Sequence, residues 1–207
     1  MSAKTYRINE IFYSLQGEGM WTGTPMVFVR LSGCNLRCPF CDTAHQEGRP
    51  FSAPAILDAV RRVGGACRVI CLTGGEPLLQ ADEALIRTFS DAGYSVHVET
   101  NGTCEAPEGL DWITFSPKLD FDPRGEIRLQ HADEVKVVFR PASGEADVLL
   151  REAQVERWAR VPAEDHSLQP CADPVTGESN IAETVAYILA HPHWRLSLQT
   201  HKLLNIR

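Results

Sequence analysis

Three cysteines lie within eight positions of the chain. Cys34, Cys38 and Cys41 follow a Cys-x3-Cys-x2-Cys spacing inside the segment SGCNLRCPFCDTAH. Three thiolates can hold three corners of a cubane iron–sulfur cluster, whereas a structural zinc site normally takes four ligands in a closed tetrahedron. The missing fourth cysteine therefore indicates an iron with an open position, at which a substrate or cofactor could bind. The alternative is a structural zinc site in which His45 is the fourth ligand.

The composition bounds the class of protein. With 207 residues, 43% of them hydrophobic, the chain is long enough to bury one core, and we expect a single domain over residues 1–207. Its seven cysteines are odd in number and partly clustered, which fits metal chemistry in a reducing compartment better than a disulfide framework. No apolar run approaches the roughly 18 residues of a membrane span, and no signal-peptide pattern begins the chain, so we expect a cytoplasmic protein without a membrane partner. The net charge of −7 argues against nucleic acid as a general partner.

Short β-rich runs alternate with amphipathic segments. Strands are expected at 26–31, 68–73, 94–100, 111–116, 133–139, 166–170 and 195–200, several of them nearly all apolar, as buried parallel strands are. Helices are expected at 52–65, 81–93, 144–160 and 180–192. This alternation predicts βα units with right-handed crossovers. A full eight-unit barrel takes about 250 residues. We therefore expect an α/β fold in the form of a partial, open β/α barrel with few helices, and a flat doubly wound sheet is the alternative.

The first expected helix carries the clearest local signals. Ser52 is placed to cap its N-terminus, and Gly64 to end it. Ile56, Val60 and Val63 are expected to share its buried stripe.

Further polar and glycine-rich segments adjoin the expected strands. Residues 73–77, TGGEP, place two glycines after a strand, where a backbone without side chains can approach a ligand closely, with a simple turn as the alternative. Residues 12–23, FYSLQGEGMWTG, offer polar groups for ligand contact, with a solvated loop as the alternative. Arg30 lies in an apolar strand and needs a partner, because an unpaired buried charge is very costly. That partner could be a structural carboxylate such as Glu99 or the carboxylate of a substrate.

The cysteine spacing resembles the signature of radical S-adenosylmethionine (SAM) enzymes, in which the amino and carboxylate groups of SAM chelate the open iron. TGGEP resembles the GGE motif of the same enzymes. The ordered set EIFYSLQGEG, FVRLSGCNLRCPFCDT, LTGGEPLLQ, VETNG, SPK, LQP and LQTHK, from residue 9 to the last residues, resembles the 7-carboxy-7-deazaguanine synthase family.

This resemblance implies a fold, an activity and partners. The fold would be the partial barrel of radical SAM enzymes. The activity would be that of a carbon–nitrogen lyase of the queuosine and 7-deazapurine pathway, which converts 6-carboxy-5,6,7,8-tetrahydropterin to 7-carboxy-7-deazaguanine with loss of ammonia. The cofactors would be SAM, a 4Fe-4S cluster and Mg²⁺. A flavodoxin or a ferredoxin-type protein would donate the electron, and the enzyme would be a homodimer.

The resemblance also assigns residues, motif by motif. Cys34, Cys38 and Cys41 would ligate the cluster, and Thr43 would supply an oxygen to Mg²⁺, a hard ion that prefers oxygen ligands. The pterin would be bound by Leu15, Gln16, Gly17, Arg30, Thr73, Glu99, His201 and, through its terminal carboxylate, Arg207. SAM would be bound by Gly75, Glu76, Ser116, Pro117, Lys118, Gln169, Pro170, Cys171 and Ala172. No residue is identified as a general base.

Two other classes of function fit parts of the pattern. One is a different radical SAM enzyme, such as a glycyl-radical activase, which shares the cysteine triad but lacks counterparts of LQGEG and LQTHK. The other is a non-enzymatic zinc or iron–sulfur interaction module, which would not respond to SAM.

Overall fold

One mixed sheet organises the residues that the computed structural model describes, 4–173 and 175–207. Its strands are β1 (Tyr6–Leu15), β2 (Pro25–Leu31), β3 (Arg49–Phe51), β4 (Val69–Gly74), β5 (Ser95–Thr100), β6 (Trp112–Phe115), β7 (Glu134–Phe139), β8 (Asp165–Pro170) and β9 (Arg195–Leu196). Within these described residues the strand order is β3-β1-β2-β4-β5-β6-β7-β8-β9, with β3 and β9 as the two free edges. From β2 to β9 the order runs in one direction, without the reversal that defines a doubly wound sheet. The sheet is thus an open, partial barrel, which confirms the fold expected from the sequence over the doubly wound alternative.

Parallel pairing joins each strand from β2 to β9 with its neighbour. Six of these strands begin and end within one residue of the limits expected from the sequence. The apolar character of these runs is explained by their position, since both faces of a parallel sheet are covered. β1 adds to the edge of β2 in antiparallel fashion, and β3 pairs with β1 in the same way.

The two ends of the chain differ from the sequence-based expectation. β1 extends to Leu15, so the first residues of the segment 12–23 are strand and not loop. The register of β1 with β2 shifts between Ile8 and Glu10, and this irregularity breaks the period-two pattern by which a strand is recognised. At the other end, β9 covers only two residues of the expected strand over 195–200, and the short helix α5 (Thr200–Leu203) begins at the last residue of that segment.

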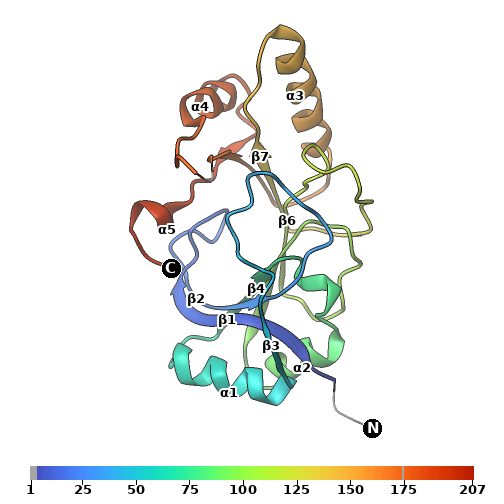
Figure 1. Cartoon of the computed structure of the whole chain (residues 1–207), viewed down its shortest axis with the longest axis vertical. Helices are drawn as coiled ribbons and strands as arrows, with labels where there is room; N and C mark the ends of the chain where they lie inside the picture. Colours follow the sequence, from blue (N-terminus) through green and yellow to red (C-terminus); the bar gives the residue numbers. More distant parts are fainter. Residues whose placement is uncertain (1–3, 174) are drawn as a thin grey trace.

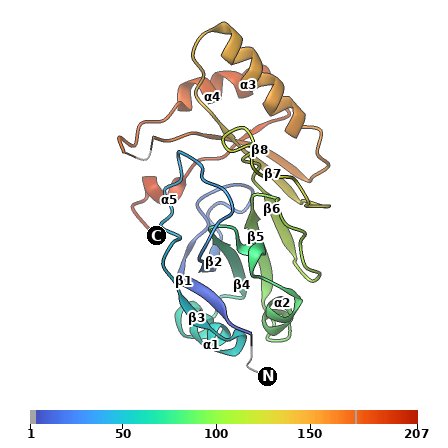
Figure 2. The same cartoon turned by 45° about the vertical axis from the view of Figure 1, so that its right-hand side comes forward.

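Four longer helices cover the convex face of the sheet, and the sequence predicts all four. They are α1 (Ala53–Gly64), α2 (Glu83–Ser90), α3 (Glu145–Trp158) and α4 (Ile181–Ala190). α1 and α2 pack on the half of the sheet that holds β1 to β5, and α3 and α4 pack on β7 and β8 (Figures 1 and 2). Within the described part of the chain, no helix has both the length and the apolar character needed to span a membrane.

The ends of α1 lie where the sequence predicts them, but fewer of its residues are buried than predicted. The Ser52 hydroxyl accepts a hydrogen bond from the backbone N–H of Ala55, which confirms the expected N-cap. Val60 is fully buried, whereas Val63 is 41% exposed, so the placement of Val63 on the buried stripe is wrong. Val63 lies in the last turn, where Gly64 faces Val27 of β2 instead.

Side chains of the parallel strands alternate between two faces. Val29, Leu72 and Val98 point outward into the core beneath α1 and α2. Their immediate neighbours Arg30, Thr73 and Glu99 point to the concave face, where they line a cavity. The concave face is closed on one side by α5 and the loop after β2, which Figure 2 shows beside each other and which the Lys202–Asp42 ion pair joins.

Candidate active site

A cavity of about 650 Å³ opens at the carboxyl ends of the parallel strands. Its wall contains all of the site residues predicted from the sequence except Glu76 and Pro117. These lining residues are Leu15, Gln16, Gly17, Arg30, Cys34, Cys38, Cys41, Thr43, Thr73, Gly75, Glu99, Ser116, Lys118, Gln169, Pro170, Cys171, Ala172, His201 and Arg207. In parallel sheets the loops after the strands lie at one rim, which explains why motifs far apart in the sequence meet here.

The three predicted cluster cysteines lie in the loop after β2. Cys34 Sγ accepts from the backbone N–H of Leu36 at 3.4 Å, and the N–H of Cys41 donates to the carbonyl of Cys38 at 3.2 Å. Burial raises the pKa of the Cys34 thiol and raises that of Cys38 to about 11, and the neighbouring thiols add to both effects. Burial thus favours the protonated forms of Cys34 and Cys38, and a bound cationic centre is what would favour their thiolate forms.

The spacing of these thiols suits a cluster better than a single ion. Among residues 4–173 and 175–207, no three His, Cys, Asp or Glu side chains are gathered closely enough to hold one metal ion. Zinc needs its sulfur ligands about 2.3 Å from one centre, whereas a cubane offers a separate iron to each thiolate. Three thiols on the wall of one cavity, with no acidic side chain between them in the sequence, fit the cubane.

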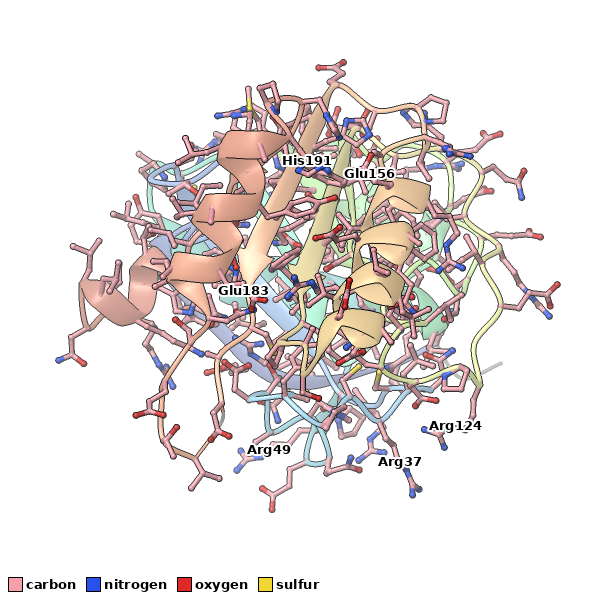
Figure 3. All side chains as sticks on the ribbon, turned by 90° about the horizontal axis from the view of Figure 1, so that it is seen from above. Arg37, Arg49, Arg124, Glu156, Glu183 and His191 are labelled. Carbon is pink, nitrogen blue, oxygen red and sulfur yellow. The ribbon has the colours of Figure 1, made fainter. Side chains whose placement is uncertain are left out.

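Hydrogen bonds from neighbouring loops hold the cysteine loop. The Asn35 amide donates to Thr103 Oγ1 at 2.7 Å, and the N–H of Arg37 donates to Asp122 Oδ2 at 2.7 Å. Asp122 also binds the guanidinium of Arg124, and Figure 3 shows Arg37 and Arg124 projecting on the same side of the molecule. These bonds tie the loop after β2 to the loops after β5 and β6.

The glycine motif packs directly against the cysteine loop. A Cβ on Gly75 would lie 1.9 Å from the carbonyl oxygen of Gly33, so only glycine fits between the two backbones. The N–H of Glu76 donates to the same carbonyl at 2.9 Å. The close contact of the Gly75 backbone in this structure is with the backbone of Gly33, and its approach to a ligand stays a prediction.

Glu76 points away from the cavity and into the fold. Its carboxylate is fully buried and accepts from the N–H of Leu78 at 3.0 Å, the Thr100 hydroxyl at 2.8 Å and the N–H of Asn101 at 2.7 Å. Burial raises the pKa of Glu76, although these donors oppose the effect. Glu76 thus connects the loop after β4 with the end of β5, behind the glycines.

Arg30 is paired, but not with the carboxylate suggested by the sequence. Its Nε donates to Glu10 Oε1 at 2.8 Å, and Glu10 Oε2 lies 3.0 Å from Nη2 of Arg207. Ser14 Oγ also donates to the carbonyl of Arg207. The last residue therefore lies against β1 at the wall of the cavity, and the side chain of Arg30 remains about one-fifth exposed there.

The cavity wall also holds a buried charge cluster that the sequence motifs do not predict. Lys136 Nζ lies 2.9 Å from Glu18 Oε2 and 2.8 Å from Glu99 Oε2. Burial raises the pKa of Glu18, but the charge of Lys136 and the hydrogen bonds to Glu18 together lower the pKa by more, so the net shift is downward. For Glu99 burial prevails and raises the pKa to about 7. The available signal was the lysine within the apolar run DEVKVVF, since a charge in a buried strand requires a partner.

Comparison with known proteins identifies the family. Residues 28–122 match the family model described as "Radical SAM superfamily". A 7-carboxy-7-deazaguanine synthase from Bacteroides thetaiotaomicron is 47% identical over 201 residues, which covers 97% of this chain and 98% of the relative. The chain belongs to the 7-carboxy-7-deazaguanine synthase family.

Other members support the same assignment to the synthase family. A 7-carboxy-7-deazaguanine synthase from Bradyrhizobium diazoefficiens is 41% identical, over 98% of this chain and all of that relative. The crystal structure of QueE from Escherichia coli superposes with a TM-score of 0.71 at 30% identity, over 94% of this chain and 93% of that one. Membership in this radical SAM family implies a 4Fe-4S cluster and SAM as cofactors of the synthase.

Replacing Glu76 by Gln tests its role in joining the loops of the synthase. All three of its partners donate, so an amide nitrogen in place of one oxygen leaves at least one buried donor unpaired. We expect the free energy of unfolding to fall by about 1–3 kcal/mol in urea titrations. The control is Glu83→Gln on the exposed side of α2, which should change stability by much less. Equal losses for the two variants would contradict the role.

Proposed function

We propose that this synthase catalyses the radical SAM ring contraction of 6-carboxy-5,6,7,8-tetrahydropterin to 7-carboxy-7-deazaguanine with release of ammonia, in queuosine or other 7-deazapurine biosynthesis. Relatives bearing this enzyme's name match the chain over nearly its whole length. The observation that carries the proposal is that a single cavity joins the cysteine triad to Arg30 and Glu99, the groups that suit a carboxylated pterin. The chain acts in this proposal as one catalytic domain over residues 1–207, in the cytoplasm.

The cofactors would be held by the loops at the cavity mouth. Cys34, Cys38 and Cys41 would ligate three irons of the cluster, which with bound SAM supplies a 5′-deoxyadenosyl radical. The SAM pocket would be formed by the backbone of Gly75, by Ser116 and Lys118 after β6, and by Gln169, Pro170, Cys171 and Ala172 after β8. Pro117 would hold the turn between Ser116 and Lys118, outside the cavity wall. Glu76 would support this pocket from behind. The task of these residues is to place the reacting carbon and to exclude water.

The substrate would lie deeper in the cavity, across β2, β4 and β5. Arg30 would bind the pterin carboxylate, since its guanidinium reaches the cavity while its Nε is held by Glu10. Thr73, Glu99 and His201 would contact the ring system, together with Leu15, Gln16 and Gly17 at the end of β1 and the terminal carboxylate of Arg207.

Mg²⁺ would bind at Thr43, two residues after Cys41. The Thr43 side chain lines the cavity and makes no side-chain hydrogen bond within the described residues, so its hydroxyl is available to a ligand. A hydroxyl is a suitable ligand for a hard ion that keeps most of its shell for water and substrate oxygens. Mg²⁺ there would orient the substrate carboxylate together with Arg30.

Two partners complete the proposal. The electron for the cluster would come from a flavodoxin or ferredoxin-type protein, because reductive SAM cleavage needs the low end of the cluster potential range of about −700 to +450 mV. The synthase would act as a homodimer.

Turnover of the reconstituted enzyme tests the function directly. The protein is purified and reconstituted without oxygen and is then supplied with dithionite, SAM, Mg²⁺ and the carboxypterin. We expect a product whose mass is that of the substrate less one ammonia, and formation that requires SAM. A cluster that responds to SAM without forming this product would indicate a different radical SAM enzyme. A colourless zinc protein would indicate an interaction module.

Replacing Cys38 by Ala tests the ligand assignment. We expect the visible absorbance of the cluster and the turnover to be lost, because two thiolates cannot hold the cubane, while the far-ultraviolet circular dichroism stays unchanged. The matched control is Cys67→Ala, which removes a thiol that does not line the cavity. Survival of colour and activity in the Cys38 variant would contradict the assignment.

Removing Mg²⁺ tests the role of Thr43. We expect chelation to slow turnover much more than it weakens SAM binding, since the ion would contact the substrate and not SAM. Thr43→Ala should have the same effect, and Thr43→Ser should restore much of the rate because it keeps the hydroxyl. Parallel loss of turnover and SAM affinity would refute this role for the ion.

A further inference from the structure

A buried lysine lies between two carboxylates on the concave face of the sheet. Lys136 is only 4% exposed and bonds to Glu18 and Glu99, each about one-fifth exposed toward the cavity. The three groups come from β7, from the loop after β1 and from β5, so only the complete fold brings them together. Their formal charges sum to −1. Burying three charges is expensive, and two of them could have been replaced by apolar side chains without loss of stability.

The cluster has acceptor capacity that the protein does not use. Glu99 Oε1 accepts from Gln16 Nε2 at 3.2 Å, and Glu18 Oε1 accepts from Gln199 Nε2 at 2.9 Å. Each oxygen of the two carboxylates thus has one donor from the protein within the described residues, although a carboxylate oxygen accepts about two. Both carboxylates line the cavity and are about one-fifth exposed, so a ligand with N–H donors could use the remaining capacity.

The same face of the sheet carries a cation farther along the cavity. Arg30 on β2 and Glu99 on β5 are separated by β4, which is two strand spacings or about 10 Å. A planar ligand lying across β4 could therefore place a carboxylate at Arg30 and N–H donors at Glu99. An amino-oxopyrimidine ring has such donors on one edge, namely its amino group and the adjacent ring N–H.

We propose that Lys136 is a positioning residue for substrate binding, which holds Glu18 and Glu99 as an acceptor site of single negative charge for the N–H groups of an amino-oxopyrimidine ring. The inference rests on the proposed function, since the carboxypterin carries this ring. Two of the three N–H donors of Lys136 are taken by Glu18 and Glu99, and its side chain is only 4% exposed, so its effect on the ligand acts through these two carboxylates. Without the lysine, two like charges would share the site and one of them would take up a proton.

The charges around Glu99 determine the sign of the pH dependence. Burial raises the pKa of Glu99 to about 7, Lys136 lowers it, and Glu134 and Glu18 raise it. The charged and titratable groups that face the cluster are Glu18 after β1, Arg30 on β2, Cys71 on β4, Lys118 after β6, Glu134 and Lys136 on β7, and His201 in α5. An ionised carboxylate forms the stronger hydrogen bond with an N–H donor. Ligand affinity should therefore fall as the pH drops through 7, and removal of Lys136 should move this loss to higher pH.

Binding of 6-carboxypterin to the oxidised, SAM-loaded enzyme tests the proposal without turnover. This fluorescent probe carries the same ring edge and carboxylate, and its own titration is common to all variants. We expect Lys136→Met to raise the Kd about tenfold at pH 7, as for the loss of one charge-assisted contact. The pH below which affinity is lost, called the acid limb, should rise by about one unit. Glu18→Gln should move the limb down, because it removes a like charge.

The double variant with Lys136→Met and Glu18→Gln restores the cluster charge to −1, and its acid limb should return toward that of the wild type. A purely structural lysine predicts no such recovery. The control for loss of a buried cation is Arg151→Met, which breaks the Arg151–Glu183 pair between α3 and α4 and should leave the pH dependence unchanged. Figure 3 shows Glu183 on α4, on the convex side of the sheet.

The outcomes separate this inference from the proposed function. If the wild type binds the probe but the single variants share its pH dependence, or the double variant is no better than Lys136→Met, the positioning role is wrong. If the wild type neither binds the probe nor converts the carboxypterin, the proposed function itself fails. If Lys136→Met does not fold, Glu18→Gln still tests the inference, because it keeps the lysine and its acid limb should move to lower pH.

Discussion

Parallel hydrogen bonding from β2 to β8 is the constraint on which the site depends. It brings the loops after successive strands to one rim and gives alternate residues of each strand to one face. Arg30, Thr73, Glu99 and Lys136 therefore face one cavity, although more than 100 positions separate the first from the last. Local structure alone could not produce this arrangement, because each strand contributes only one or two of the groups.

Contacts between backbones then join the loops to each other. Gly75 meets the carbonyl of Gly33 at a distance that no side chain permits, and the Glu76 carboxylate accepts from the last residue of β5 and from the first residue after it. The cysteine loop thus rests on two neighbouring loops before any cofactor is present. Such support favours a site whose geometry is established by folding, at the cost of burying a carboxylate that only a full set of donors makes tolerable.

Much of this could be predicted from the sequence, and the failures have physical causes. The apolar runs and helix caps predict β2, β4 to β8 and α1 to α4, because burial and capping leave direct signals in residue type, whereas the three-residue strand β3 is not predicted. β1 is not predicted as a strand, because a register shift interrupts its alternation. The motifs predict most residues that line the cavity. They do not show that Glu76 points into the fold or that Arg30 pairs with Glu10, since pairing across strands depends on register. Lys136 was missed because its partners lie in β5 and in the loop after β1, far from it in sequence.

The two edges of the open barrel bear on how copies of this chain can associate. β3 has three residues, of which Pro50 has no N–H to donate and Arg49 is exposed, and β9 has only two residues. Short edge strands, proline and exposed charge all discourage the addition of a strand from another molecule. Assembly by continuation of the sheet is therefore disfavoured at both ends. A dimer of this synthase would have to be built from side-chain surfaces of helices and loops, and its formation would leave the strand order of each subunit unchanged.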